Sequence, residues 1–210
     1  MADQLARYAI LPLVGWASGI NVYLTTAILG IGARAGWLEL PAGLDPLKNP
    51  LVIALAVILY AVEFVADKVP YVDSLWDSFH TFIRPAAAGT MGYMAANQGG
   101  VLAGTVLALL TGSIALDTHA VKATTRLAIN TSPEPVSNIA ASIAEHSFVV
   151  FILWFFAKHP ILAVLIVLAL FIASFVVIRF LWRVALAVLR AIFRREKPAA
   201  YSELKSPQKT

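Results

Sequence analysis

Residues Pro85–Leu116, PAAAGTMGYMAANQGGVLAGTVLALLTGSIAL, decide how this chain folds. The stretch is apolar, but the polar sequence NQGG at 97–100 interrupts it near the middle. One straight helix of this length would be roughly 48 Å long, which exceeds the hydrocarbon core of a bilayer. Each half is short for a full crossing. We therefore predict two short helices that meet at 97–100 as a re-entrant hairpin, with two thin complete spans as the alternative.

Small residues recur at every fourth position of the same stretch. They are Ala88, Gly92, Ala96, Gly100, Gly104, Ala108 and Gly112. Such a stripe allows helix backbones to approach each other closely inside a membrane. The pattern therefore favours a hairpin that is buried among other helices.

The composition of the whole chain places it in a lipid environment. Of its 210 residues, 60% are hydrophobic and only 13% are charged, and the mean hydropathy is +0.78. A water-soluble fold of this size could not bury so much apolar surface. The chain contains no Cys, which excludes disulfides, thiolate metal sites and Cys nucleophiles. We expect an all-α integral membrane protein with no cofactor and no nucleic-acid partner.

Four segments have the apolar length of a membrane span, about 20 residues. We predict spans over residues 10–33, 51–66, 136–157 and 161–178. The start of the chain shows no cleavable signal peptide, so the first apolar run is expected to be retained as a span. Residues 1–195 should form one membrane domain, followed by a polar, disordered cytoplasmic tail at 196–210.

The distribution of basic residues predicts the orientation in the membrane. With four full spans and a hairpin that returns to its own side, both termini lie on one face. That face carries thirteen of the sixteen Lys and Arg residues, so both termini are predicted to be cytoplasmic. After the last span, Arg179, Arg183, Arg190 and Arg194 fall near one helical face, which predicts an amphipathic extension lying on anionic lipid.

Two amphipathic segments flank the hairpin. One polar stripe consists of Asp73, Asp77, His80 and Arg84, and the other of His119, Lys122, Arg126 and Asn130. In one interpretation they are interfacial helices whose polar faces touch water and headgroups. In the other, the two stripes face each other across a cytoplasmic vestibule. The sequence Arg84-Pro85 suits a helix start, whose amides attract anions.

Further polar residues are predicted to lie within the spans themselves. Glu63 and Asp67 share a face of the second span with Tyr60. Ser132 is a plausible N-cap of the third span, which would place Glu145 about 18 Å along that helix. Charged groups at such depth are candidates for function. The structural alternative is a neutral Glu145 that hydrogen-bonds to Asn21 or a Ser.

Three long motifs carry a resemblance to a known family. They are SGINVYLTTAILG (18–30), VEFVADKVPYVDSLWDSFHTFIRPAAAG (62–89) and KATTRLAINTSPEPVSNIAASIAEHS (122–147). Over residues 10–175 the chain resembles the bacterial membrane family known as domain of unknown function 4126. The resemblance supports the predicted spans and implies a bacterial inner membrane. Members of that family usually carry an acidic residue where this chain has His146. A shorter segment, TFIRPAAAGTMGYM (81–94), is similar to the re-entrant motif of DedA-type lipid carriers.

These observations favour a small inner-membrane transporter or lipid-carrier flippase for an anionic substrate, with proton coupling as an option. Glu145 and Glu63 would exchange protons, while Arg84, Lys122 and Arg126 would attract the anion. The predicted pathway residues are Asn21, Glu63, Asp67, Asp73, Asp77, His80, Arg84, Asp117, His119, Lys122, Arg126, Asn130, Glu134, Asn138 and Glu145.

Other functions are open. Asp73, Asp77, His80, Asp117, His119 and Glu134 could serve a divalent-cation permease, because oxygen and imidazole ligands suit Mn, Fe or Zn. A membrane scaffold or assembly factor without transport is a further possibility. No nucleophile elbow, zinc-protease motif or phosphate loop is present, so we do not expect an enzyme. Four spans and a hairpin make a thin wall for a pathway, which suggests a homodimer.

Overall fold

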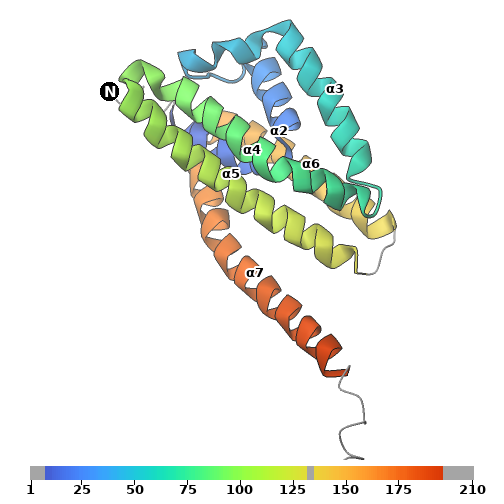
Figure 1. Ribbon diagram of the computed structural model, residues 1–210. Helices are drawn as coiled ribbons and strands as arrows, with labels where there is room; N and C mark the ends of the chain where they lie inside the picture. Colours follow the sequence, from blue (N-terminus) through green and yellow to red (C-terminus); the bar gives the residue numbers. More distant parts are fainter. Residues whose placement is uncertain (1–7, 132–134, 196–210) are drawn as a thin grey trace, which may run out of the picture.

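The computed structural model describes residues 8–131 and 135–195. In this part of the chain every regular element is helical (Figure 1). The elements are α2 (Ile10–Arg34), the 3₁₀ helix η1 (Ala42–Lys48), α3 (Pro50–Ala66), α4 (Val72–Ala96), the short 3₁₀ helix η2 (Asn97–Gly99), α5 (Val101–Ile129), α6 (Pro135–Lys158) and α7 (Pro160–Arg195). The predicted fold class, an all-α integral membrane protein, is confirmed.

Four of these helices are long and apolar enough to cross a membrane. They are α2, α5, α6 and the first part of α7, Pro160–Phe180. The predicted span at 51–66 is present as α3. Its 17 residues are too few for a span by themselves, and α3 reaches the required length only together with η1, which meets it at an angle of 68°. Ser132, Glu134 and the predicted tail at 196–210 lie outside the described residues.

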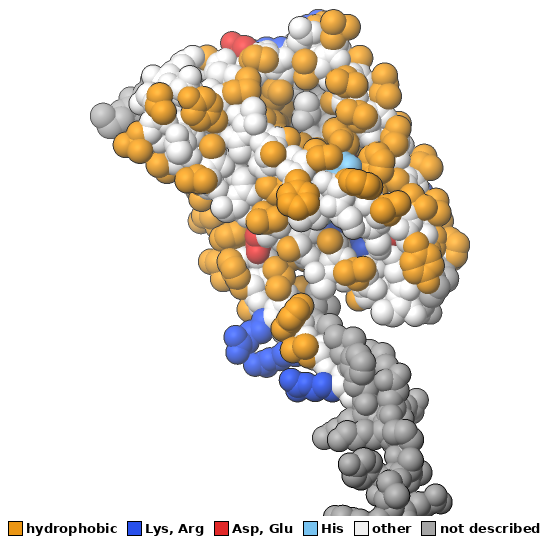
Figure 2. Space-filling model, viewed as in Figure 1, with side chains coloured by type: hydrophobic (Ala, Val, Ile, Leu, Met, Phe, Trp, Pro, Cys, Tyr) orange, Lys and Arg blue, Asp and Glu red, His pale blue; other side chains and the backbone are white. Residues whose placement is uncertain are grey.

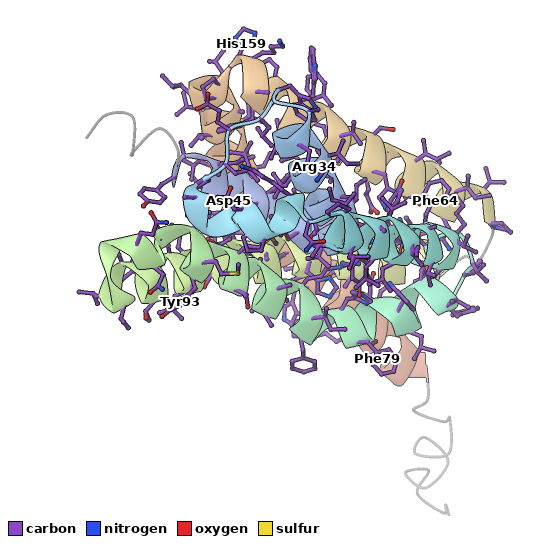
Figure 3. The ribbon with its side chains drawn as sticks, turned by 90° about the horizontal axis from the view of Figure 1, so that it is seen from above. Arg34, Asp45, Phe64, Phe79, Tyr93 and His159 are labelled. Atoms are coloured by element: carbon purple, nitrogen blue, oxygen red, sulfur yellow. The ribbon has the colours of Figure 1, made fainter. Side chains whose placement is uncertain are left out.

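The central hairpin consists of α4 and α5, which pack along each other and meet at η2 (Figures 1 and 3). The predicted break is confirmed, and Gly100 has the positive φ of 98° that glycine tolerates at such a turn. The predicted arm lengths are wrong. The flanking amphipathic segments continue into the arms, so α4 has 25 residues and α5 has 29. Pro85 therefore lies inside α4 and offers no helix start to an anion.

Small residues let the two arms touch. A Cβ atom added at Gly92 would lie 2.5 Å from the carbonyl oxygen of Leu107, and one at Gly104 would lie 2.9 Å from the ring of Tyr93. The close backbone approach predicted from the small-residue stripe is confirmed. The same kind of contact joins α2 to α5, where a Cβ at Gly19 would lie 2.5 Å from the Ala115 carbonyl oxygen.

Helix α2 forms the centre of the bundle. In its apolar window 78% of the residues are buried, compared with 17–33% in the other three candidate spans. The remaining helices pack around it, and α7 extends beyond the others at one end (Figure 1). Because α2 is surrounded on all sides, its polar residues can meet side chains from several helices at once.

The outside of the bundle is apolar and its inside is partly charged. On α4, Phe79 and Phe82 are 63% and 78% exposed, and Phe79 points away from the bundle in Figure 3. Asp77 and Arg84 of the same helix are at most 2% exposed. Figure 2 shows hydrophobic side chains over most of the visible surface. This inversion of a water-soluble fold is expected for a protein whose solvent is lipid.

Candidate functional site

The site is built around a break in α2. Asn21 has extended backbone angles, φ −154° and ψ 104°, inside an otherwise helical segment. Its side-chain Oδ1 accepts the Leu24 amide at 2.8 Å, as an N-cap does for the second half of the helix. The carbonyl of Ile20, the ordinary helical partner of that amide, instead accepts from Nζ of Lys122 at 3.2 Å. Residues 18–21 therefore present backbone acceptors to the interior.

Arg84 of α4 fills the centre of the site. Its side chain is completely buried. Nη2 donates to Oε1 of Glu63 at 2.7 Å and lies 3.0 Å from Oδ1 of Asp77. Nη1 donates to the carbonyl of Gly19 at 3.1 Å and to Nδ1 of His119. Arg84 thus connects α3, α4 and α5 to the broken segment of α2.

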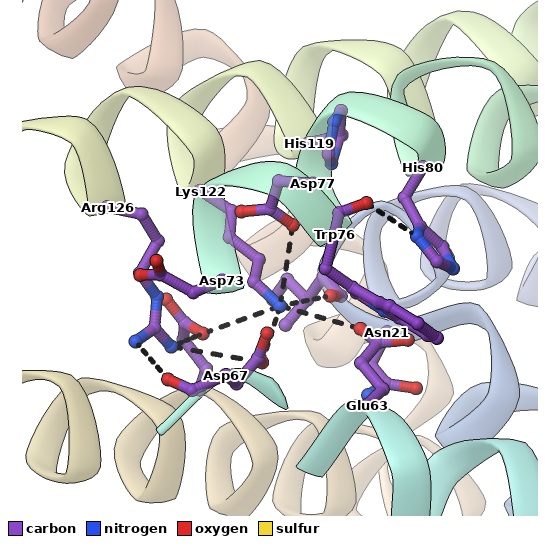
Figure 4. Close-up of polar contacts among 12 residues, drawn as sticks. Asn21, Glu63, Asp67, Asp73, Trp76, Asp77, His80, His119, Lys122 and Arg126 are labelled. Carbon is purple, nitrogen blue, oxygen red and sulfur yellow. Dashed lines mark hydrogen bonds and ion pairs between the residues drawn. The ribbon is translucent and has the colours of Figure 1, made fainter. Parts of the chain in front are cut away.

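Lys122 of α5 lies close to two of the same carboxylates, Glu63 and Asp77 (Figure 4). Its Nζ is 2.7 Å from Oδ2 of Asp67, which follows the last residue of α3. It is also 3.5 Å from Glu63 and 3.9 Å from Glu145. The ammonium is therefore shared among carboxylates from α3, α4 and α6.

Arg126, one turn further along α5, connects the site to α6. Its Nη2 donates to Oε2 of Glu145 at 2.7 Å. Its Nη1 donates to the carbonyl of Asp67 at 3.1 Å and to both oxygens of Asn138. Asn138 donates to Asn130, which in turn donates to Asp73 at 2.8 Å. The polar chain thus continues from the bundle centre to the beginning of α4.

We call these charged groups the charge cluster: Glu63, Asp67, Asp73, Asp77, Glu145, Arg84, Lys122 and Arg126. Within the described residues it holds five carboxylates and three cations, an excess of two negative charges. Five carboxylate oxygens have no hydrogen-bond partner there, namely Glu63 Oε2, Asp67 Oδ1, Asp73 Oδ2 and both oxygens of Asp77. Buried, unpaired negative charge is unfavourable in a medium of low dielectric constant. The cluster is therefore suited to take up protons.

The excess does not fall on Asp67. Burial disfavours its charged form, but the Lys122 ammonium and the Arg126 guanidinium together hold the pKa of Asp67 well below its ordinary value. Asp67 is thus the fixed negative charge of the cluster.

Two of the buried histidines have both ring nitrogens engaged. His80 has Nδ1 2.8 Å from the Trp76 carbonyl and Nε2 3.1 Å from the Tyr23 hydroxyl. His119 accepts from Arg84 at Nδ1 and contacts the Thr81 hydroxyl at Nε2. Because a neutral imidazole has one donor and one acceptor, each of these arrangements fits the neutral form.

Two cavities reach the site from different sides of α6. The first has a volume of about 260 Å³ and lies between α2, α5, α6 and α7, with Lys122 and Glu145 among its lining residues. The second is an aromatic groove of about 470 Å³ between α3 and α6, and His146 is part of its lining. Glu145, at 18% exposure, is the most accessible carboxylate of the cluster.

The structure brings nearly all predicted pathway residues together in this site. Asp117 is the exception among those described: it borders the first cavity and accepts a hydrogen bond from Ser174 of α7. Both interpretations of the two polar stripes are wrong in part. The stripes do face each other, but their side chains are in direct buried contact and enclose no vestibule.

Two further expectations need correction. Glu145 does not hydrogen-bond to Asn21. It accepts a hydrogen bond from Arg126, and its neighbour His146 is the residue that contacts Asn21. His146 was missing from the predicted set. The sequence feature that could have identified it is the face of α3 that carries Tyr60 and Phe64 and ends at Asp67. These residues supply the two rings and the carboxylate that surround His146.

The described residues contain no group of three or more His, Asp or Glu side chains arranged to hold a metal ion. The side chains proposed for a divalent-cation permease do not converge. Asp117 faces α7, and the ring nitrogens of His80 and His119 are hydrogen-bonded to other groups. That hypothesis gains no support from the geometry.

Comparison with known proteins identifies the family but no activity. The family model described as domain of unknown function (DUF4126) matches residues 10–180, so the chain belongs to this family. No curated protein and no solved structure matches the chain. What the site does must therefore be argued from its own chemistry.

Proposed function

We propose that this protein is a small proton-coupled transporter for an anionic substrate in the bacterial inner membrane, with both termini on the cytoplasmic side. The charge cluster would be its coupling site. The observation that carries the proposal is the position of Glu145, which pairs with Arg126 and Lys122 while bordering the first cavity.

An anion that enters this cavity would meet Lys122 and Glu145 on its lining, whereas Arg126, the main partner of Glu145, is buried. A substrate carboxylate or phosphate offers the same charge and acceptor oxygens, so it can replace the Glu145 carboxylate on Arg126. The displaced Glu145 would then be a further unpaired carboxylate in a cluster that already has an excess of negative charge. The added negative charge would favour the uptake of a proton by the site as a whole. Binding of the anion and of a proton would therefore promote each other, which is the basis of symport.

The broken helix supports the same function. Discontinuous helices at the centre of a bundle are typical of secondary transporters, where freed carbonyls and helix ends line the binding site. Here the carbonyls of Gly19 and Ile20 bind Arg84 and Lys122. A change in the pairing of these cations would therefore act directly on the conformation of α2.

The lining of the first cavity points to an anion that carries an apolar part. Lys122 and Glu145 form its charged end, whereas Trp16, Leu170 and Val177 supply apolar walls. A volume of about 260 Å³ holds a headgroup and not a whole lipid. An anionic headgroup with its hydrocarbon chain directed toward the bilayer fits this lining, in line with a lipid-carrier flippase.

A flux assay in proteoliposomes tests the proposal. A pH-sensitive dye inside the vesicles would report proton entry while anionic lipid analogues and small soluble anions are offered outside. We expect one class of anion to accelerate proton entry in the parent. Glu145→Gln, which removes the carboxylate charge that the anion would displace, should still bind the anion but lose proton entry by roughly tenfold or more.

Glu39→Gln is the matched control, because Glu39 is exposed and lies far from the cluster in the sequence. It should behave like the parent. Folded protein that gives no anion-dependent flux under any proton gradient would overturn the proposal. Equal coupled flux in Glu145→Gln and the parent would support a transporter in which Glu145 takes no part in coupling.

A further inference from the structure

His146 and Glu145 are neighbours on α6 that serve different sides of the bundle. Successive residues on an α-helix point about 100° apart. Glu145 borders the cavity next to α7, whereas His146 lines the aromatic groove next to α3. The two openings share no lining residue, so the charge cluster can be reached by two separate routes.

The state of the His146 ring follows from Asn21. The Oδ1 atom of Asn21 is occupied by the Leu24 amide, so its Nδ2 must be the atom that faces His146. An amide nitrogen can only donate, and Nε2 of His146, 3.3 Å away, must therefore accept. His146 is neutral in this arrangement, with its proton on Nδ1. Among the described residues, Nδ1 is buried and has no partner.

A second hydrogen-bonding group lies close to Nε2 of His146. Oδ2 of Asp67 lies 3.5 Å from Nε2 of His146. If Nε2 binds a proton, it can no longer accept from Asn21, but the resulting imidazolium can donate to Asp67. His146 thus has one partner for its neutral form and another for its charged form.

The groove brings His146 within reach of the surroundings. Tyr60 lies edge-on to its ring at 5.4 Å, and Phe64 covers it at 5.6 Å. The rest of the groove is lined by Ile143, Ser147, Val150, Phe151 and Trp154. The ring itself is only 4% exposed, so it lies at the inner end of the groove.

We propose that His146 is the residue that takes up the coupling proton, and that this proton arrives through the groove between α3 and α6. The inference deepens the proposed function by separating the proton route from the substrate route. In the uptake step a proton binds Nε2 of neutral His146, the hydrogen bond from Asn21 is released, and the imidazolium pairs with the Asp67 carboxylate. The proton then remains on His146 because Lys122 and Arg126 keep Asp67 ionised.

The groups that face His146 are consistent with this role. Helix α2 contributes the uncharged Asn21, and α3 contributes Tyr60, Phe64 and, at its end, Asp67. The cations of α5 act through Asp67. On α6, Ser142 lies one turn before His146, and Glu145 is directed to Arg126. Lys68 approaches Ser142 at 3.2 Å. Release of Asn21 would free the residue at the break of α2, which links proton uptake to the helix that carries the site.

Hydrogen–deuterium exchange at the ring carbon of histidine, followed by mass spectrometry over a series of pH values, tests the proposal without any substrate. Its rate depends on solvent access and on protonation, and the four histidines of the chain are measured separately. In lipid nanodiscs we expect His146 to exchange and titrate, and to do so faster than His119. The exposed His159 provides the upper reference.

Two cavity-filling variants separate the routes. Ser147→Trp would obstruct the groove and should slow exchange at His146 roughly threefold or more, while leaving His80 and His119 unchanged. Ala173→Trp, which fills the first cavity, should leave His146 unchanged. Asp67→Asn should lower the pH midpoint of His146 by about one unit, because the charge that stabilises the imidazolium is lost.

The outcomes distinguish the two proposals. Exchange at His146 that is as slow as at His119 at every pH, or that is unaffected by Ser147→Trp, would overturn the inference even if coupled flux is found. A titrating His146 that Ser147→Trp slows, together with no flux for any anion, would keep the proton site and overturn the transporter. If Asp67→Asn does not fold, the two tryptophan variants still decide the question.

Discussion

Arginines lie in two regions of this molecule with opposite surroundings. On the hairpin, Arg84 of α4 and Arg126 of α5 are completely buried and each contacts carboxylates. On α7, Arg179, Arg183 and Arg190 are exposed, and Figure 2 shows a basic patch beyond the apolar part of that helix. In both regions helical spacing places the arginines on a polar face, but it does not say what that face meets.

Available partners explain the difference. Helix α4 carries Asp73 and Asp77 on the same face as Arg84, and α3 adds Glu63 and Asp67. Helix α7 contains no Asp or Glu at all. A guanidinium can leave water for a protein interior only with its counter-charges, so the hairpin arginines enter the bundle and those of α7 stay outside. The comparison predicts different sensitivities to substitution.

The largest effect is expected at the centre of the hairpin. Arg84→Ala would leave Glu63 and Asp77 as uncompensated buried charges, which costs about 3–5 kcal/mol in comparable cases. We expect little folded protein, or a strongly lowered unfolding midpoint in detergent. Arg183→Ala is the matched control and should change stability by less than about 0.5 kcal/mol. Similar midpoints for the two variants would contradict the division into buried and exposed arginines.

A smaller effect is expected where the buried network has neutral members. Asn138→Ala removes the link between Arg126 and Asn130, leaving polar groups unsatisfied at a cost of about 1–3 kcal/mol. Thermal unfolding in the same detergent measures it. Asn97→Ala, at the exposed turn of the hairpin, is the control and should leave the midpoint unchanged. If Asn97→Ala lowered the unfolding midpoint as much as Asn138→Ala, loss of the buried network would not be the cause of the destabilisation.

The smallest effect concerns α7. Replacing Arg179 and Arg183 by Ala should weaken the attraction to anionic lipid by about 1 kcal/mol per residue without altering stability in neutral detergent. The number of anionic lipids that co-purify, or native mass spectrometry in lipid mixtures, provides the measurement. Unchanged lipid retention would show that this basic patch serves another surface.

Much of the candidate site was predictable because charge inside a membrane protein is rare. Glu63 and Glu145 were identified by their depth in the spans, and the helical spacing placed Arg84 with Asp77 and Lys122 with Arg126. The break at 97–100 followed from the polar sequence NQGG. Pro85 led to a wrong prediction. Proline is common at helix starts, but here α4 begins before Pro85 and continues through it.

The sequence by itself determined the lipid environment, the helical segments, the close-packed hairpin and the residues that carry charge, because these depend on composition and local spacing. Only the tertiary structure decided that the two polar stripes pair with each other in the buried interior, that α2 breaks at Asn21, and that Glu145 and His146 face different cavities. Each of these depends on groups from three or more helices meeting at one point. Electrostatic pairing and burial set that arrangement, and spacing along a single helix does not contain it.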